Sequence, residues 1–274
     1  MDTAMRFKGK VVVITGAGRG IGLSTAHKFV AEGASVVVGE IDEELGRRAV
    51  EQLEADGGEA AFVACNVSRP DQAAKLIGDT VATFGRLDIC VNNAGTNLGG
   101  DVLTVTEADF DSVIGVNVKG PFFVAQAAAK EMVRAGTKGS IVNISSVVSV
   151  VAVADQPVYS ISKSAINGFT RMLAMTLAEN GIRVNAVGPG TIMTDMSDGV
   201  MNLSGDPDSY NRMLSRTPLG RLGQPDEVAE VVLFLASDAA SYMTGQVVYP
   251  DGGRLSLNHV MPMTWDPVAT PDES

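Results

Sequence analysis

The stretch TGAGRGIG, residues 15–22, directly follows the apolar run VVVI and decides how the rest of the chain is interpreted. Three of its four glycines, Gly16, Gly20 and Gly22, lie where a buried strand would pass into a helix. Glycine weakens regular structure, so such a cluster marks either a tight turn or a backbone that a ligand approaches closely. A strand, a glycine turn and a helix N-terminus together suit a phosphate group, because the first helical amides are unpaired and lie at the positive end of the helix dipole. The spacing, GxxxGxG, is one residue wider than GxGxxG.

Short apolar runs alternate with helical segments on both sides of this stretch. Seven of these runs are predicted to be strands: residues 10–16, 34–40, 61–67, 88–95, 140–146, 183–190 and 246–253. They are apolar on both alternating faces, which is typical of strands that are covered on both sides. The repeated strand–helix–strand order implies right-handed crossovers. We therefore predict an α/β fold, a single domain over residues 7–253 with a doubly wound (Rossmann) seven-stranded parallel sheet and helices on both faces.

Two segments do not follow this alternation. Residues 191–216 are rich in Met, Ser, Asp and Gly and come directly after a predicted strand. Ligands of open α/β sheets bind beyond the carboxyl ends of the strands, so this segment is predicted to be a substrate lid. Residues 254–274 form a C-terminal tail with the single tryptophan, Trp265. The tail either reaches the site of a neighbouring subunit or is disordered.

Composition narrows the classes of partner. The net charge of −11 argues against nucleic acid, whose phosphates require a basic surface. No run of about 18 apolar residues is present, and VVVI is too short for a secretion signal, so we expect a cytoplasmic protein without a membrane span.

Cys65 and Cys90 are expected to be buried free thiols. His27 and His259 stand alone, so no metal site is predicted.

Glu40 lies at the end of the second predicted strand, 18 residues beyond Gly22. In dinucleotide-binding folds, an acidic residue about 20 residues beyond the glycine loop accepts a hydrogen bond from the ribose 2′-hydroxyl. A carboxylate at this position repels a 2′-phosphate, which favours NAD over NADP. Arg19, inside the glycine loop, argues in the other direction because its cation would attract that phosphate.

Tyr159 and Lys163 are four residues apart in YSISK, so on a helix they share one face. A cation near a phenol favours the phenolate and lowers its pKa, and such a phenol can exchange a proton with a carbonyl or an alcohol oxygen. Ser146 closes the predicted strand 13 residues earlier and can hydrogen-bond the same oxygen. Ser145 competes for this role, but strand alternation sends the two hydroxyls to opposite sides.

Taken together, these motifs resemble those of the classical short-chain dehydrogenase/reductase (SDR) family over residues 7–253. They occur in the family's order: TGAGRGIG, NNAG at 92–95, VNV around Asn117, the set Ser146, Tyr159 and Lys163, and PGTIMT at 189–194. Each motif alone is moderate support, whereas five in register leave coincidence negligible.

The resemblance implies a role for each matching residue. Tyr159 would be the acid/base, Lys163 would lower its pKa and bind the nicotinamide ribose, and Ser146, which matches the family's serine, would orient the substrate oxygen. Asn117 would help to hold a water that links Lys163 to solvent as a proton relay. The cofactor-binding residues implied are Gly16, Arg19, Gly20, Ile21, Gly22, Glu40, Asn66, Val67, Asn93, Ala94, Gly95, Tyr159, Lys163, Pro189, Gly190, Ile192 and Thr194.

This chain departs from the family's pattern at two positions. It has Asn66-Val67 where Asp-Val usually touches the adenine, and the asparagine carbonyl is expected to accept from the adenine amino group instead. Glu40 replaces the commoner aspartate, which lengthens the reach and keeps the charge.

The expected function is that of an NAD(H)-dependent oxidoreductase that interconverts a secondary alcohol and a ketone. Residues 147–157 and 191–213 offer mainly Val, Ala, Met and Leu, which favours an apolar or cyclic substrate. The resemblance also implies a homotetramer with its main interface on the helices around Asn117 and Tyr159. The alternatives are an NADPH-dependent 3-ketoacyl (carrier-protein) reductase, and a dinucleotide sensor without turnover.

Overall fold

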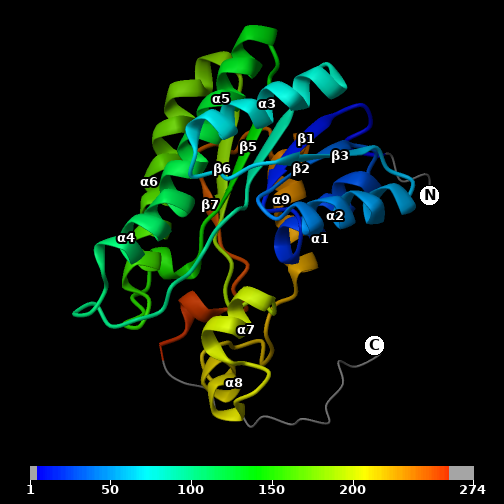
Figure 1. The fold of residues 1–274 in the computed structure, drawn as a ribbon. Helices are drawn as coiled ribbons and strands as arrows, with labels where there is room; N and C mark the ends of the chain where they lie inside the picture. Colours follow the sequence, from blue (N-terminus) through cyan, green and yellow to red (C-terminus); the bar gives the residue numbers. More distant parts are fainter. Residues whose placement is uncertain (1–4, 259–274) are drawn as a thin grey trace.

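The computed structural model describes residues 5–258 and forms one parallel sheet covered by helices (Figure 1). The seven strands lie in the order β3-β2-β1-β4-β5-β6-β7. Their bounds are β1 Val11–Thr15, β2 Ser35–Glu40, β3 Ala60–Ala64, β4 Ile89–Asn92, β5 Ser140–Ile144, β6 Arg183–Val187 and β7 Val247–Val248. The order reverses between β1 and β4, which is the switch point where ligands of such sheets bind. The predicted doubly wound fold is confirmed.

Helices form a layer on each face of the sheet (Figure 1). One layer contains α1 (Gly20–Ala31), α2 (Glu43–Ala55) and α9 (Pro225–Ala236). The other contains α3 (Pro70–Phe84), α5 (Gly120–Ala135) and α6 (Pro157–Leu177), with α4 (Glu107–Ile114) against α6. No helix among residues 5–258 is both long and apolar enough to cross a membrane.

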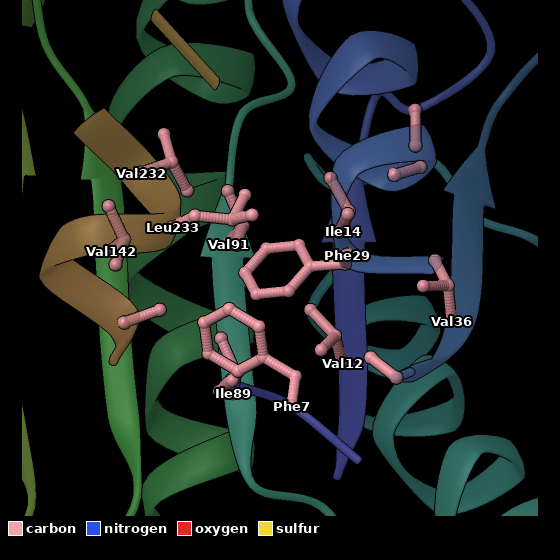
Figure 2. Packing of buried hydrophobic residues seen from close by; sticks show 14 of the residues in the cluster. Phe7, Val12, Ile14, Phe29, Val36, Ile89, Val91, Val142, Val232 and Leu233 are labelled. Atoms are coloured by element: carbon pink, nitrogen blue, oxygen red, sulfur yellow. The ribbon is translucent and has the colours of Figure 1, made fainter. Parts of the chain in front are cut away.

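Alternation along β1 explains why both faces are covered. Val12 and Ile14 point towards α1 and α9, where they lie near Phe29 and Leu233 (Figure 2). Val13, between them, belongs to the core on the opposite face. Each large apolar side chain that is fully buried stabilises the fold by about 1.5–3 kcal/mol, so a strand with no polar face needs helices on both sides.

Six of the seven strands end earlier at their carboxyl ends than the sequence predicts, and only β2 ends at the predicted residue. β4 ends at Asn92 and β6 at Val187, and β7 has only two residues. The segments that follow leave the ladder and become loops. Asn93 holds one of these loops in place, because its side-chain amide donates to the carbonyls of Thr15 at 3.0 Å and Gly16 at 2.8 Å.

The predicted lid contains two short helices, α7 (Asp195–Met201) and α8 (Pro207–Leu214). Figure 1 shows them as a small unit beside the sheet layers, next to the red segment that follows β7. The unit has its own apolar centre, made by Leu203, Leu214 and Leu222. Trp265 and the rest of residues 259–274 lie outside the described residues.

Candidate active site

A cavity of about 1030 Å³ lies at the carboxyl ends of the strands and extends under α7 and α8. It brings together residues from segments far apart in the chain. The sequence-predicted residues that line it are Gly16, Arg19, Gly20, Ile21, Glu40, Asn66, Val67, Asn93, Ala94, Gly95, Ser146, Tyr159, Lys163, Pro189, Gly190, Ile192 and Thr194. Gly22 and Asn117 are outside the lining, and each has a supporting contact described below.

The glycine loop leaves the start of α1 open. Gly16 and Gly20 have positive φ angles, +64° and +57°, which glycine adopts without strain. A Cβ on Gly22 would lie 2.2 Å from the Gly16 carbonyl oxygen, so this glycine serves close packing of the loop. Arg19, at the N-cap of α1, provides no side-chain cap, and the first turn holds no acid. The first amides of α1 therefore suit a pyrophosphate.

The Glu40 carboxylate is fixed at the edge of the cavity. Its two oxygens accept hydrogen bonds from the Gly18 amide at 3.1 Å and the Ile41 amide at 2.8 Å. Arg19 forms an ion pair with Asp195 of α7, with 3.5 Å between nitrogen and oxygen. Arg19, the cation that was expected to attract a 2′-phosphate, is thus already paired with Asp195.

Asn66 is held in a way that the sequence did not indicate. Its carbonyl oxygen accepts from the Ser68 amide at 3.0 Å and from the Ser68 hydroxyl at 2.7 Å. The atom that faces a backbone N–H must be the oxygen, so the amide nitrogen is the group left for a ligand. The expected contact from the Asn66 carbonyl to the adenine amino group stays a prediction, and in the chain by itself Ser68 occupies that carbonyl.

Ser146, Tyr159 and Lys163 come together where β5 ends and α6 begins. The Ser146 hydroxyl accepts from the Val148 amide at 3.3 Å and lies near enough to the Tyr159 phenol to favour its phenolate form. The Lys163 ammonium lies 5.5 Å from the centroid of the Tyr159 ring. The Ser145 hydroxyl instead donates to the side chain of Asn167 at 2.7 Å, which agrees with the expected alternation.

Burial sets the ionisation of this group. It raises the pKa of Tyr159 to about 12, against the effect of the hydrogen bond from Ser146. It lowers the pKa of Lys163 to about 8, because a buried ammonium loses its hydration. The predicted lowering of the Tyr159 pKa by Lys163 does not occur in the chain by itself. The ammonium points to the backbone, where it donates to the Ile144 carbonyl at 2.9 Å.

Asn117 lies in a one-turn π-helix, Gly115–Lys119, between α4 and α5. Its oxygen accepts from the Thr96 amide, and its nitrogen donates to the Thr96 carbonyl, both at 2.8 Å, and to the Ser162 hydroxyl at 3.0 Å. The side chain thus joins the loop after β4 to α6, one residue before Lys163. Nothing in the residue pattern marks the π-helix, which is why only the family resemblance pointed to Asn117.

Three arginines that sequence reasoning missed also line the cavity: Arg212, Arg216 and Arg254. Arg212 lies on α8, and Arg216 follows four residues later in the turn after that helix. Arg254 had no signal in the sequence, since only the fold brings the segment after β7 next to α8. The apolar wall is present as expected, with Val147, Met196, Val200 and Met213 among its members.

Comparison with known proteins agrees with this geometry. Residues 16–254 match the family model described as enoyl-(acyl carrier protein) reductase, a model of short-chain dehydrogenases/reductases. The chain belongs to the short-chain dehydrogenase/reductase family. A 3-oxoacyl-(acyl-carrier-protein) reductase of Thermotoga maritima is 43% identical over 91% of this chain and 99% of its own length.

Solved structures of the SDR family have the same fold. A short-chain type dehydrogenase/reductase from Mycobacterium marinum has a TM-score of 0.86 and 33% identity, covering 92% of this chain and 97% of its own. A protein of Agrobacterium tumefaciens, crystallised with bound NADP, has a TM-score of 0.84 and 32% identity, covering 93% of this chain and all of its own. The chain is therefore an oxidoreductase of the type that uses a nicotinamide dinucleotide.

Proposed function

We propose that this SDR is an NAD(H)-dependent enzyme that interconverts a secondary alcohol and a ketone with an apolar or cyclic body. The observation that carries the proposal is the placement of Ser146, Tyr159 and Lys163 in the cavity that also holds the uncapped start of α1. One end of the cavity can bind a dinucleotide, while the other offers a proton donor and an apolar wall.

Tyr159 is the proton donor and acceptor in this proposal. Its phenol gives a proton to a ketone oxygen and takes one back from an alcohol, while the Ser146 hydroxyl holds that oxygen in place. Lys163 keeps donors free beyond its bond to Ile144, and these suit a ribose hydroxyl and a water near Asn117. NAD(H), when bound, would supply the hydride donor or acceptor.

Glu40 supports NAD as the cofactor. Its carboxylate faces the cavity with both oxygens fixed by amides, so a ribose 2′-hydroxyl has an acceptor and a 2′-phosphate meets a like charge. The adenine would lie near Asn66 and Val67, and the pyrophosphate at α1, near Gly20 and Thr194. The nicotinamide would lie near Ile192 and Lys163.

A second candidate is an NADPH-dependent 3-ketoacyl reductase. The 3-oxoacyl-(acyl-carrier-protein) reductase of Thermotoga maritima, 43% identical to this chain, favours this alternative. The three arginines in the cavity agree with an acidic carrier, while Glu40 argues against the phosphorylated cofactor.

The deciding experiment compares wild type with Tyr159→Phe. We measure NADH and NADPH binding by fluorescence and ketone reduction by nicotinamide absorbance. Loss of an acid/base group lowers the rate by about 10²- to 10⁴-fold, so the variant is expected to lose turnover and to keep NADH affinity. Tighter NADPH binding would support the ketoacyl reductase. Equal rates for the two proteins would exclude Tyr159 as the acid/base.

A further inference from the structure

The cavity holds more positive charge than the chain around it. Its lining includes five cations, namely Arg19, Lys163, Arg212, Arg216 and Arg254, and three acids, namely Glu40, Asp155 and Asp195. The whole chain carries a net charge of −11. A local excess of cations in an acidic protein attracts anions to that place, because a cleft concentrates the field of its wall.

Two of the three lid-side arginines have no salt bridge within residues 5–258. Arg212 is compensated by Asp206, 3.7 Å away on α8. Arg254, half-buried at the start of the turn Arg254–Ser256, donates to the Thr191 hydroxyl at 3.2 Å and forms no ion pair there. Arg216, exposed just after α8, likewise has no carboxylate partner among these residues.

Asp251, the acid nearest to Arg254 along the chain, already binds backbone amides with both carboxylate oxygens. The two oxygens of Asp251 accept from the backbone amides of Gly253 at 2.9 Å and Leu255 at 2.8 Å. Burial lowers the pKa of Arg254, and the neighbouring charge of Arg216 lowers it further, while Asp251 opposes both. Both cations thus line the same cavity.

We propose that the substrate carries an anionic group, a carboxylate or a phosphate, which Arg254 and Arg216 bind at the lid end of the cavity. This proposal rests on the proposed function. A guanidinium presents paired donors that match the oxygens of either anion. Met213, whose sulfur lies 3.8 Å from Arg254, and Val200 provide apolar wall beside these cations. The substrate therefore has an apolar body with an anionic end.

The same anion chemistry has two further sources, the phosphates of a coenzyme A thioester and the pyrophosphate of the cofactor. The cofactor is the weaker explanation, because the uncapped start of α1 provides amides for its pyrophosphate. Arg254 contacts Thr191 and Met213, on the segment that leads into and through the lid. The three sources differ in which ligand loses affinity when the arginines are removed.

The test uses ketones in matched pairs, such as 4-acetylbenzoate with its methyl ester and 4-oxopentanoate with its methyl ester, and acetoacetyl-coenzyme A as a third arm. Wild type is compared with Arg254→Gln, Arg216→Gln and the control Arg134→Gln. Arg134 is an exposed residue of α5 that pairs with Glu131, so the control changes the net charge equally. Losing a hydrogen bond to a charged group lowers kcat/KM by about ten- to a hundredfold.

We expect that fall in the two lid variants for the acids, chiefly through KM, with the esters and the control unchanged. A fall confined to the coenzyme A thioester would also support the proposal and place the anion in the acyl carrier. Equal loss for acid and ester would overturn it, as would weaker NADH binding, which would assign the arginines to the cofactor.

A separate readout keeps the two proposals distinguishable. The affinity of 4-acetylbenzoate for the protein–NADH complex is measured by calorimetry in the Tyr159→Phe background, where the ketone is not reduced. Binding that weakens about tenfold or more in Arg254→Gln supports the anion site even if no ketone is reduced, in which case only the proposed function fails. If turnover occurs and neither acid nor thioester depends on either arginine, the anion site fails and the oxidoreductase remains.

Discussion

At the scale of single residues, Lys163 shows that the site lowers the stability of the fold. The side chain is 4% exposed, and its ammonium has one hydrogen bond among the described residues, to the Ile144 carbonyl. Burial moves its pKa to about 8 from the ordinary 10.5. Between these two values the unfolded chain binds the proton more tightly than the folded one. The free energy of unfolding therefore rises with pH over this range.

We expect the variant Lys163→Met to lack this pH dependence. From pH 7 to pH 10 the wild type should gain up to about 3 kcal/mol of stability relative to the variant, because a pKa difference of one unit corresponds to about 1.4 kcal/mol. Urea unfolding of both proteins at pH 7, 8, 9 and 10 measures the difference, in which the other groups cancel. A difference that stays constant over this range would mean that Lys163 has an ordinary pKa in the folded protein.

The residues that line the cavity were predictable from the sequence where each could be assigned from its own position in a motif. Glu40, Tyr159 and Ser146 were all assigned to the cavity in advance, and the structure brings them there. The orientation of Asn66 was not predictable, because it depends on Ser68 as a donor. The direction of the Tyr159 pKa shift was not predictable either, because burial depends on the whole surrounding fold, and in the chain by itself it outweighs the effect of Ser146.

At the scale of elements, the junction between β1 and α1 depends on the absence of side chains. A Cβ on Gly22 would lie 2.2 Å from the Gly16 carbonyl oxygen and 2.4 Å from the side-chain nitrogen of Asn93. That nitrogen donates to the backbone of the glycine loop, so its displacement disturbs the loop and the start of the helix together.

We expect Gly22→Ala to destabilise the protein by about 2 kcal/mol or more, as an overpacked position does, and to weaken NADH binding. The matched control is Gly78→Ala, an exposed site within α3 where a Cβ meets nothing within 4 Å. This control should gain up to about 1 kcal/mol, because alanine favours helix. Thermal unfolding and NADH titration measure both effects, and a Gly22→Ala protein as stable as the wild type would refute the packing argument.

Elements were predictable where a repeating pattern specifies them. The seven strands follow from apolar runs, and the structure places all seven in one sheet. The carboxyl ends of six of them were predicted too long, because the apolar pattern runs on into loops such as the one after Asn92. The π-helix Gly115–Lys119 carries no comparable pattern, and Asn117 within it is held by Thr96 and Ser162, which are distant in the chain.

At the scale of the whole molecule, the layer that positions the catalytic group also faces outwards. α5 and α6 cover one face of the sheet with their inner sides, and α6 carries both Tyr159 and Lys163. Their outer sides expose Phe122, Met172 and Met175, the last of them 67% exposed. Large apolar side chains gathered on neighbouring helices are typical of the centre of an interface between identical subunits.

We expect the protein to form a homotetramer through this face, and Met172→Glu to break it. In a two-fold interface the same patch meets itself, so the new carboxylate is desolvated near its own copy and the interface is weakened. The control is Leu103→Glu, at a loop position that is 89% exposed. Sedimentation velocity should show four chains of 28.5 kDa for the wild type and the control, and a smaller species for Met172→Glu. A wild type that sediments as one chain would contradict the assembly, whereas an intact Met172→Glu tetramer would move the interface away from α6.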